Sequence, residues 1–196
     1  MKQGLIVFAV IVVVLMLMIF PMISSYNGMV SREQAVSGQW SVVENVYQRR
    51  ADLIPNLVST VKGYAAHEKS TLQGVVEARA KATSVNIDPS KLNAESIQQF
   101  QNAQSGLSSA LSKLMVVVEK YPDLKANQNF LDLQAQLEGT ENRISNERRK
   151  FSEMTQDYNT YIKSFPKNLF AGMFGFTEKP YYKADAGAEK APTVAF

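Results

Sequence analysis

The sequence predicts an all-α protein in which an N-terminal transmembrane helix precedes an elongated antiparallel bundle of long, kinked helices. Two observations predict this class. An uncharged apolar run fills residues 4–24, and the remaining chain repeats its apolar residues every three or four positions, the period of a helix face. No stretch alternates apolar and polar residues for long enough to form a strand. The expected architecture therefore resembles a four-helix bundle.

The first predicted element is a membrane anchor. After a short flank at residues 1–3, residues 4–24 read GLIVFAVIVVVLMLMIFPMIS without a charged side chain. About twenty helical residues extend roughly 30 Å, the thickness of the hydrocarbon core. The run is longer than a secretory h-region and no small-residue cleavage pattern follows it, so an uncleaved signal anchor is expected. Lys2 in front of the run favours, by one charge, a bundle on the outer side.

A hinge is predicted between the anchor and the bundle. Residues 25–30 contain Asn27-Gly28, a pair that favours turns. The bundle is predicted to span residues 31–165. Its first helix is expected to begin near Arg32, because Ser31 has the spacing of a capping box with the glutamine three positions later.

The bundle is predicted to contain three long helices with short connections. The first passes Pro55, whose missing N–H donor predicts a kink or a restart, and it ends near Ser84. After a loop at residues 85–93, the second helix ends where Tyr121-Pro122 stops it. A turn at residues 122–126 leads into a helix of roughly 40 residues, which is expected to be the longest element. Short connections make neighbouring helices antiparallel.

An apolar segment follows the bundle at residues 166–182, with lysines nearby. Six large side chains in and just before it are candidates for interaction: Phe165, Leu169, Phe170, Met173, Phe174 and Phe176. Three arrangements stay open, in which the segment caps the end of the bundle, docks on a neighbouring subunit or enters a lipid interface. Residues 183–196 are predicted to be a flexible or partner-held tail.

The composition argues against several classes of function. The chain has no cysteine, which excludes disulfides, thiolate metal sites and a cysteine nucleophile. A net charge of +3 offers too little basic excess for binding to nucleic acid. The single His67 is not followed by a second histidine at metalloprotease spacing, and Glu138 and Glu141 are interpreted as a solvated face. We therefore expect no enzyme activity, no cofactor, no metal and no small-molecule substrate.

Several charged residues are candidates for structural ion pairs inside the bundle: Arg49, Arg50, Asp52, Glu68 and Arg148. Arg148 falls on the buried seam of its helix, so it is expected to pair across the bundle with an acid. The acids considered for this role are Glu44, Asp52 and Glu68. Pairs of this kind fix the register of helices more than they add stability.

Two blocks of the sequence resemble the LemA family of bacterial membrane proteins. The first block is YQRRADLIPNLVSTVKGYAAHEKSTLQGVVEAR (Tyr47–Arg79), and the second is NFLDLQAQLEGTENRISNERRKFSEMTQDYNTYIKSFPKNLFAGMFGF (Asn129–Phe176). The Tyr26-Asn27 pair after the apolar run also fits the family. The resemblance implies a single-pass protein of the bacterial cytoplasmic (inner) membrane with a four-helix-bundle-like domain, and it carries over no catalytic residue.

These observations lead to one expected function and two alternatives. We expect a non-enzymatic, membrane-anchored helical scaffold that self-associates into a homo-oligomer at the cell envelope, with membrane lipid as its other partner. The first alternative is an adaptor for another envelope protein, such as a membrane protease or a stress-response component. The second is a lipid-binding or membrane-shaping protein.

Overall fold

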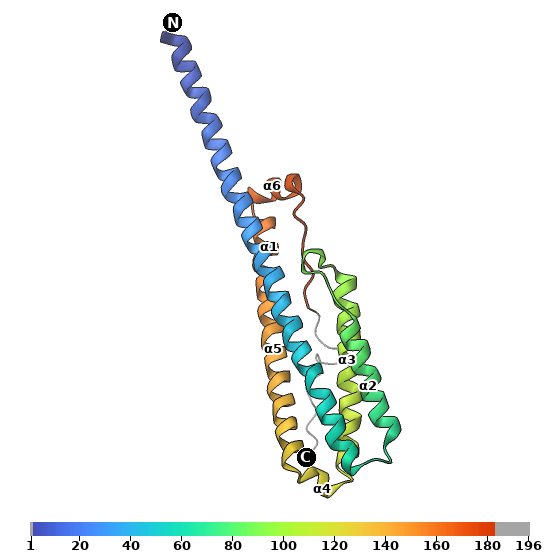
Figure 1. The fold of residues 1–196 in the computed structure, drawn as a ribbon. Coiled ribbons are helices and arrows are strands. Elements are labelled where there is room, and N and C mark those ends of the chain that lie inside the picture. The colour runs from blue at the N-terminus through green and yellow to red at the C-terminus, as the bar shows by residue number, and fades with distance from the viewer. Residues whose placement is uncertain (1, 183–196) are drawn as a thin grey trace, which may run out of the picture.

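The computed structural model describes residues 2–182, and within them it contains helices and no strand, which confirms the all-α class (Figure 1). The predicted tail at residues 183–196 lies outside the described residues. The elements are α1 (Lys2–Tyr64), α2 (Lys69–Ser84), the 3-10 turn η1 (Pro89–Lys91), α3 (Ala94–Val118), α4 (Pro122–Lys125), α5 (Gln128–Lys163) and α6 (Lys167–Phe174).

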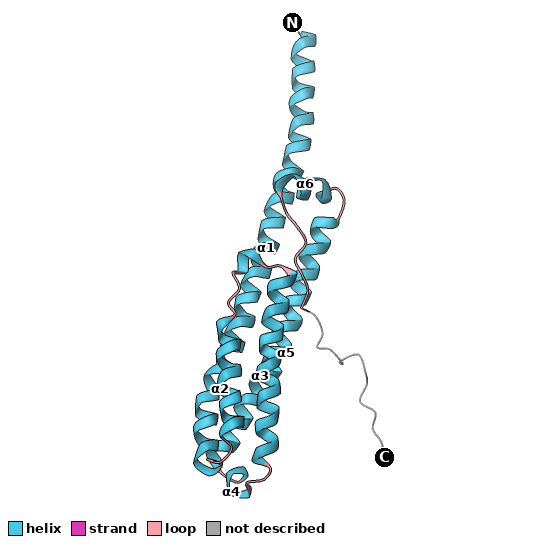
Figure 2. Cartoon of the chain, turned by 90° about the vertical axis from the view of Figure 1, so that its right-hand side faces the viewer, coloured by secondary structure: helices cyan, strands magenta, loops and turns pink. Residues whose placement is uncertain are grey.

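Four helices form the bundle: the C-terminal part of α1 together with α2, α3 and α5. They alternate in direction along the chain, with α1 beside α5 and α2 beside α3 (Figures 1 and 2). The N-terminal part of α1 projects beyond the bundle, and α6 lies across the end from which it projects. Within residues 2–182, no helix proves long and apolar enough to cross a membrane, so the predicted membrane span is not confirmed.

The apolar repeat builds the core as the helical period requires. The seam positions that the repeat predicts on α3 are all buried: Ile97, Phe100, Gln104, Leu107, Leu111, Leu114 and Val118. Trp40 on α1 is fully buried, and its ring lies 5.3 Å from those of Phe100 and Phe151 in edge-to-face contacts. Edge-to-face pairs at this distance suit the quadrupoles of aromatic rings. The core therefore joins α1, α3 and α5 through these three rings.

The predicted hinge at Asn27-Gly28 is wrong, because α1 continues without interruption from Lys2 to Tyr64. Gly28 serves close packing instead of a turn: a Cβ at this position would overlap the phenol of Tyr161 on α5. The guanidinium of Arg32 also lies over the ring of Tyr161, at 3.9 Å from its centroid, in a cation–π contact. The glycine thus lets α5 approach α1 where the two helices first meet.

The sequence predicted that the first bundle helix continues to Ser84, and this prediction is wrong. The helix ends at Tyr64, and residues 65–68 form a turn into α2, with the N–H of Glu68 donating to the carbonyl of Ala65 at 3.1 Å. The longest element is consequently α1 and not α5. The loop at residues 85–93 is confirmed with η1 inside it, whereas the predicted turn at residues 122–126 contains the short helix α4.

Helix α1 passes Pro55 because a side chain supplies the hydrogen bond that proline lacks. In a regular helix the N–H of residue 55 would donate to the carbonyl of Ala51. Arg79 on α2 donates to this carbonyl through its Nε, at 2.7 Å. The predicted restart at Pro55 is therefore wrong, because the helix is continuous there, and the kink stays a prediction.

Candidate functional site

The predicted interaction segment has one face that packs on the bundle. Phe170 and Phe176 are partly buried and pack against the core around Trp40. The ring of Tyr26 on α1 lies 5.1 Å from that of Phe174 and 5.7 Å from that of Phe176, in edge-to-face contacts. These contacts fix α6 to α1 close to the end of the apolar run.

The opposite face of this segment is open. Phe165, Leu169 and Met173 are 81%, 60% and 70% exposed. Leu169 and Met173 are four residues apart on α6 and share one of its faces, whereas Phe165 lies in the turn just before the helix. We call Leu169 and Met173 the exposed face of α6. Helix α6 ends at Phe174 and is capped by Gly175, which adopts a left-handed conformation with a φ of 77° that glycine takes without strain.

After α6 the chain turns back along the bundle, and we call residues 175–182 the return segment. The side-chain amide of Asn159 forms two hydrogen bonds with the backbone of Lys179, at 2.8 and 2.9 Å. The Nζ of Lys179 lies 2.7 Å from the Oε1 of Glu33, and the Lys179 residue is buried. The hydroxyl of Tyr158 donates to the carbonyl of Thr177 at 2.9 Å. These contacts hold the return segment against α1 and α5.

Burial, followed by the nearby negative charge of Glu33, raises the pKa of Tyr158 to about 12. A raised pKa means that the fold favours the neutral phenol over the phenolate. This contribution to stability is complete below the ordinary tyrosine pKa of about 10 and is lost as the pH rises through about 12.

We expect the free energy of unfolding to fall across this window, measured by urea titrations followed by circular dichroism. The free energy of unfolding of the Tyr158→Phe variant should fall less steeply with pH. Equal slopes for the variant and the native chain would contradict the raised pKa of Tyr158.

A polar cleft lies between α1, α3 and α5, and Arg50 forms its floor. The cleft has a volume of about 190 Å³. Arg50 is only 1% exposed, and its Nη1 donates to the Oε1 of Glu141 at 2.8 Å and to the Oγ of Ser108 at 3.1 Å. Its Nη2 donates to the side-chain and backbone oxygens of Gln104. The buried cation thus has acceptors from both α3 and α5.

The counter-charge of Arg50 is therefore Glu141, which the sequence had suggested was part of a solvated face. That interpretation is wrong in part, since the side chain of Glu141 is half-exposed and turns its Oε1 to the cleft. Arg148 lies over the ring of Tyr182, at 4.0 Å from its centroid. The hydroxyl of Tyr182 is 2.8 Å from that of Tyr47. Arg49 is exposed on α1.

The acids considered as partners of Arg148 make other hydrogen bonds. Glu44 accepts from the backbone N–H of Ile87 at 3.3 Å, and burial raises its pKa. Asp52 accepts from Gln48 at 2.7 Å. Glu68 accepts from the hydroxyl of Tyr121 at 3.2 Å, which ties the turn after α1 to the end of α3.

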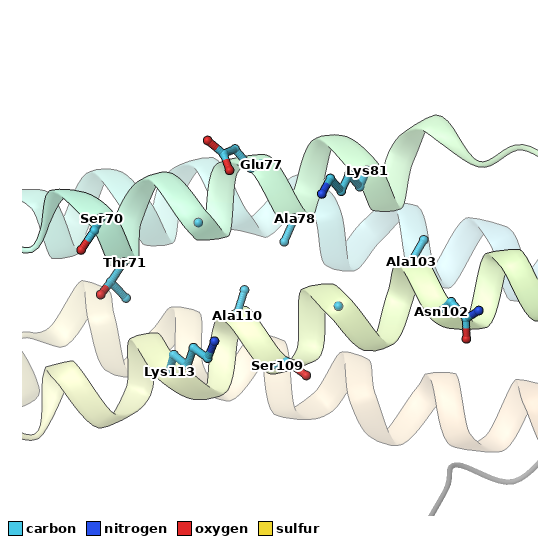
Figure 3. A pocket seen from close by; sticks show the side chains of 12 residues that line it. Ser70, Thr71, Glu77, Ala78, Lys81, Asn102, Ala103, Ser109, Ala110 and Lys113 are labelled. Carbon is cyan, nitrogen blue, oxygen red and sulfur yellow. The ribbon is translucent and has the colours of Figure 1, made fainter.

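An open groove between α2 and α3 was not found from the sequence. Its volume is about 460 Å³. Ala78 on α2 and Ala110 on α3 point into the space between the helices, and Lys81 and Lys113 lie along the groove (Figure 3). Gly74 and Gly106 also line it, and a Cβ on either glycine would meet no other atom. Residues of this size signal open space only once the two helices are placed side by side.

The described residues offer no assembly typical of a catalytic centre with a metal ion. Across residues 2–182, no group of three or more histidine, aspartate and glutamate side chains gathers to hold one. His67 lies in the turn between α1 and α2. The polar atoms of the Arg50 cleft bond mainly to one another, which favours a structural role.

Comparisons with known proteins found a matching family and several relatives. The model of the LemA family matches residues 39–196. The magnetosome protein MamQ of Magnetospirillum gryphiswaldense is 25% identical over 89% of this chain and 70% of its own length. The magnetosome protein MamQ 2 of Paramagnetospirillum magneticum is 26% identical over 81% of this chain and 64% of its own length. The protein LemA of Metamycoplasma hominis is 21% identical over 78% of this chain and 66% of its own length. Because the family model covers most of its length, this chain belongs to the LemA family.

Proposed function

We propose that this protein is a non-enzymatic helical scaffold that is anchored in the bacterial cytoplasmic membrane and self-associates there. One observation carries the anchor: α1 is a single helix whose two ends have opposite environments. Near its start, Phe20 is 79% exposed, whereas Trp40 further along the same helix is fully buried in the bundle. The run Gly4–Ile23 contains no charge. Lipid would cover this apolar surface, which water hydrates poorly.

Substitution by lysine in the apolar run tests the anchor. In Val13→Lys/Leu17→Lys, two charges at the centre of the run should cost about 5–7 kcal/mol on insertion. We expect the native chain to remain in urea-washed membranes and this variant to appear in the supernatant. The matched control, Val42→Lys/Val116→Lys, changes two exposed valines on the bundle and should stay in the membrane. Release of the native chain by urea would contradict the proposal.

The side of the membrane follows from the charge in front of the run. Lys2 favours a cytoplasmic N-terminal flank, which places the bundle on the outer side. Protease added to intact spheroplasts should then digest the bundle. Protection of the bundle until the spheroplasts are lysed would reverse this orientation.

Self-association is supported by charge and by shape. Without Lys2, the remaining residues carry 20 basic and 18 acidic groups, a net of +2, so copies repel one another weakly. The groove between α2 and α3 presents small side chains, which let a second helix approach closely. Glu77 and Lys81 supply both signs of charge for a self-complementary contact.

Filling the groove tests this contact. We expect the detergent-extracted chain to be larger than a monomer by native mass spectrometry, and Gly74→Leu/Gly106→Leu to shift it towards smaller species. Gly139→Leu is the matched control, because its Cβ also meets open space but lies on α5. A native chain that is monomeric at all concentrations would contradict self-association. A foreign protein bound in stoichiometric amount to such a monomer would favour the adaptor.

A further inference from the structure

We infer that α6 is a membrane-surface helix, whose exposed face of Leu169 and Met173, together with the adjoining Phe165, rests in the interfacial layer of the bilayer beside the entry of α1. This inference rests on the proposed membrane anchor. It assigns a lipid surface to an apolar face that the bundle leaves open.

The depth of α6 is set by its contact with Tyr26. The ring of Phe174 packs on that of Tyr26 at 5.1 Å, and Tyr26 follows Ile23, the last apolar residue of the N-terminal run, by about 4.5 Å of helix rise. Figure 2 shows α6 at the base of the projecting part of α1. A bilayer that covers the run up to Ile23 therefore ends at the level of α6.

The direction of α6 suits a surface helix. It lies crosswise to α1 at the end of the bundle (Figure 1). When α1 enters the bilayer roughly along its normal, α6 lies roughly in the plane of the membrane. Phe20 and Ile23, at the end of the apolar run on α1, are also exposed. Lipid that covers this part of α1 would then meet the exposed face of α6 at the same level.

The chemistry around α6 matches the interface of an anionic bilayer. Residues 158–177 contain aromatic residues and two lysines but no acid. Lys167 lies over the ring of Tyr161, at 4.1 Å from its centroid, and Lys163 forms an ion pair with Glu178 at 2.7 Å. Aromatic side chains and lysines gather at the interfaces of membranes, where rings sit at the level of headgroups and ammonium groups meet phosphates.

Helix α6 is already folded and packed on the bundle, so its exposed face is held in place before it meets lipid. Its other face is already packed, since Phe170 contacts the core and Ala171 is buried. The two hydrogen bonds of Asn159 with the backbone of Lys179 hold the return segment, which follows α6. A preorganised helix loses less conformational entropy on contact with lipid than a segment that must fold there.

Spin labels on single cysteines test the inference in the full chain. The native sequence has no cysteine, so each substitution gives one label. We choose Leu169→Cys and Met173→Cys on α6, Val13→Cys in the apolar run, and Val116→Cys as the matched control, an exposed apolar position on α3. The labelled protein is placed in vesicles of phosphatidylethanolamine and phosphatidylglycerol, and the collision rates of each label with oxygen and with a water-soluble nickel chelate are compared.

We expect oxygen to collide more than the nickel chelate at Leu169→Cys and Met173→Cys, as at Val13→Cys, and the reverse at Val116→Cys. Labels on α6 that behave like Val116→Cys while Val13→Cys is in lipid would overturn the inference and leave the anchor intact. Labels on α6 that are shielded from both reagents and broaden one another would show a second copy on this face and also overturn it. A water-exposed Val13→Cys would overturn the anchor itself.

Discussion

Replacing Glu141 with alanine should lower the free energy of unfolding by about 3 kcal/mol. The substitution leaves the guanidinium of Arg50 buried with only neutral acceptors. Removing one partner of a buried ion pair typically costs about 3–5 kcal/mol, because an uncompensated charge stays in a medium of low polarity. The lower end applies here, since the side chain of Glu141 is 48% exposed and water reaches its site. Urea titrations followed by circular dichroism measure the change.

The neighbouring Glu138 provides the control for this prediction. It is exposed on the same helix, so Glu138→Ala should change the free energy of unfolding by less than about 0.5 kcal/mol. The double variant Arg50→Met/Glu141→Leu removes both charges and should be more stable than Glu141→Ala. Equal effects of the two single alanine substitutions would show that Arg50 does not depend on Glu141.

Replacing Arg79 with methionine should cost about 2 kcal/mol of unfolding free energy. Residue 55 is a proline and has no N–H to donate to the carbonyl of Ala51. This carbonyl instead accepts a hydrogen bond from the Nε of Arg79 at 2.7 Å. Ala51 is buried, so without Arg79 this acceptor loses its partner, which costs about 1–3 kcal/mol. Lys81→Met, at an exposed position on the same helix, should have little effect.

A double-mutant cycle with Pro55 separates this role from general packing. Alanine at position 55 restores the backbone N–H, which donates to Ala51 as in a regular helix. In the Pro55→Ala background, Arg79→Met should therefore cost at least about 1 kcal/mol less than in the native chain. The same cost in both backgrounds would mean that Arg79 does not replace the missing donor.

The helices were predictable where the apolar repeat alone determines burial. On α3, each seam residue from Ile97 to Val118 is buried, because a helix with one apolar stripe has one way to bury it. The turn at residues 65–68 was not predictable, since its two alanines favour a helix and neither a proline nor a glycine pair marks it. Tertiary packing places this turn: Ala65 is buried, and Glu68 bonds to Tyr121.

The partners within the site could not be predicted for a related reason. Arg50 and Glu141 are 91 residues apart, and their meeting depends on the register between α1 and α5. That register depends on the turns, which the sequence located incompletely. At Gly28 the local signal for a turn was outweighed by a contact with Tyr161 that belongs to the assembled bundle. The six large apolar residues in and before α6 were predicted as a set, but which of them pack on the bundle and which stay exposed required the structure.

One continuous helix, α1, connects the apolar N-terminal run to the core of the bundle. Spin labels at Val13→Cys and Val42→Cys of the full chain, diluted with unlabelled protein in vesicles, test it through their dipolar coupling. An unbroken α1 places the two positions 29 residues apart on one helix, and we expect a single narrow distance distribution near 44 Å, at about 1.5 Å per residue. A broad distribution centred at shorter distances would show a flexible hinge at Asn27-Gly28 and contradict the continuity of α1.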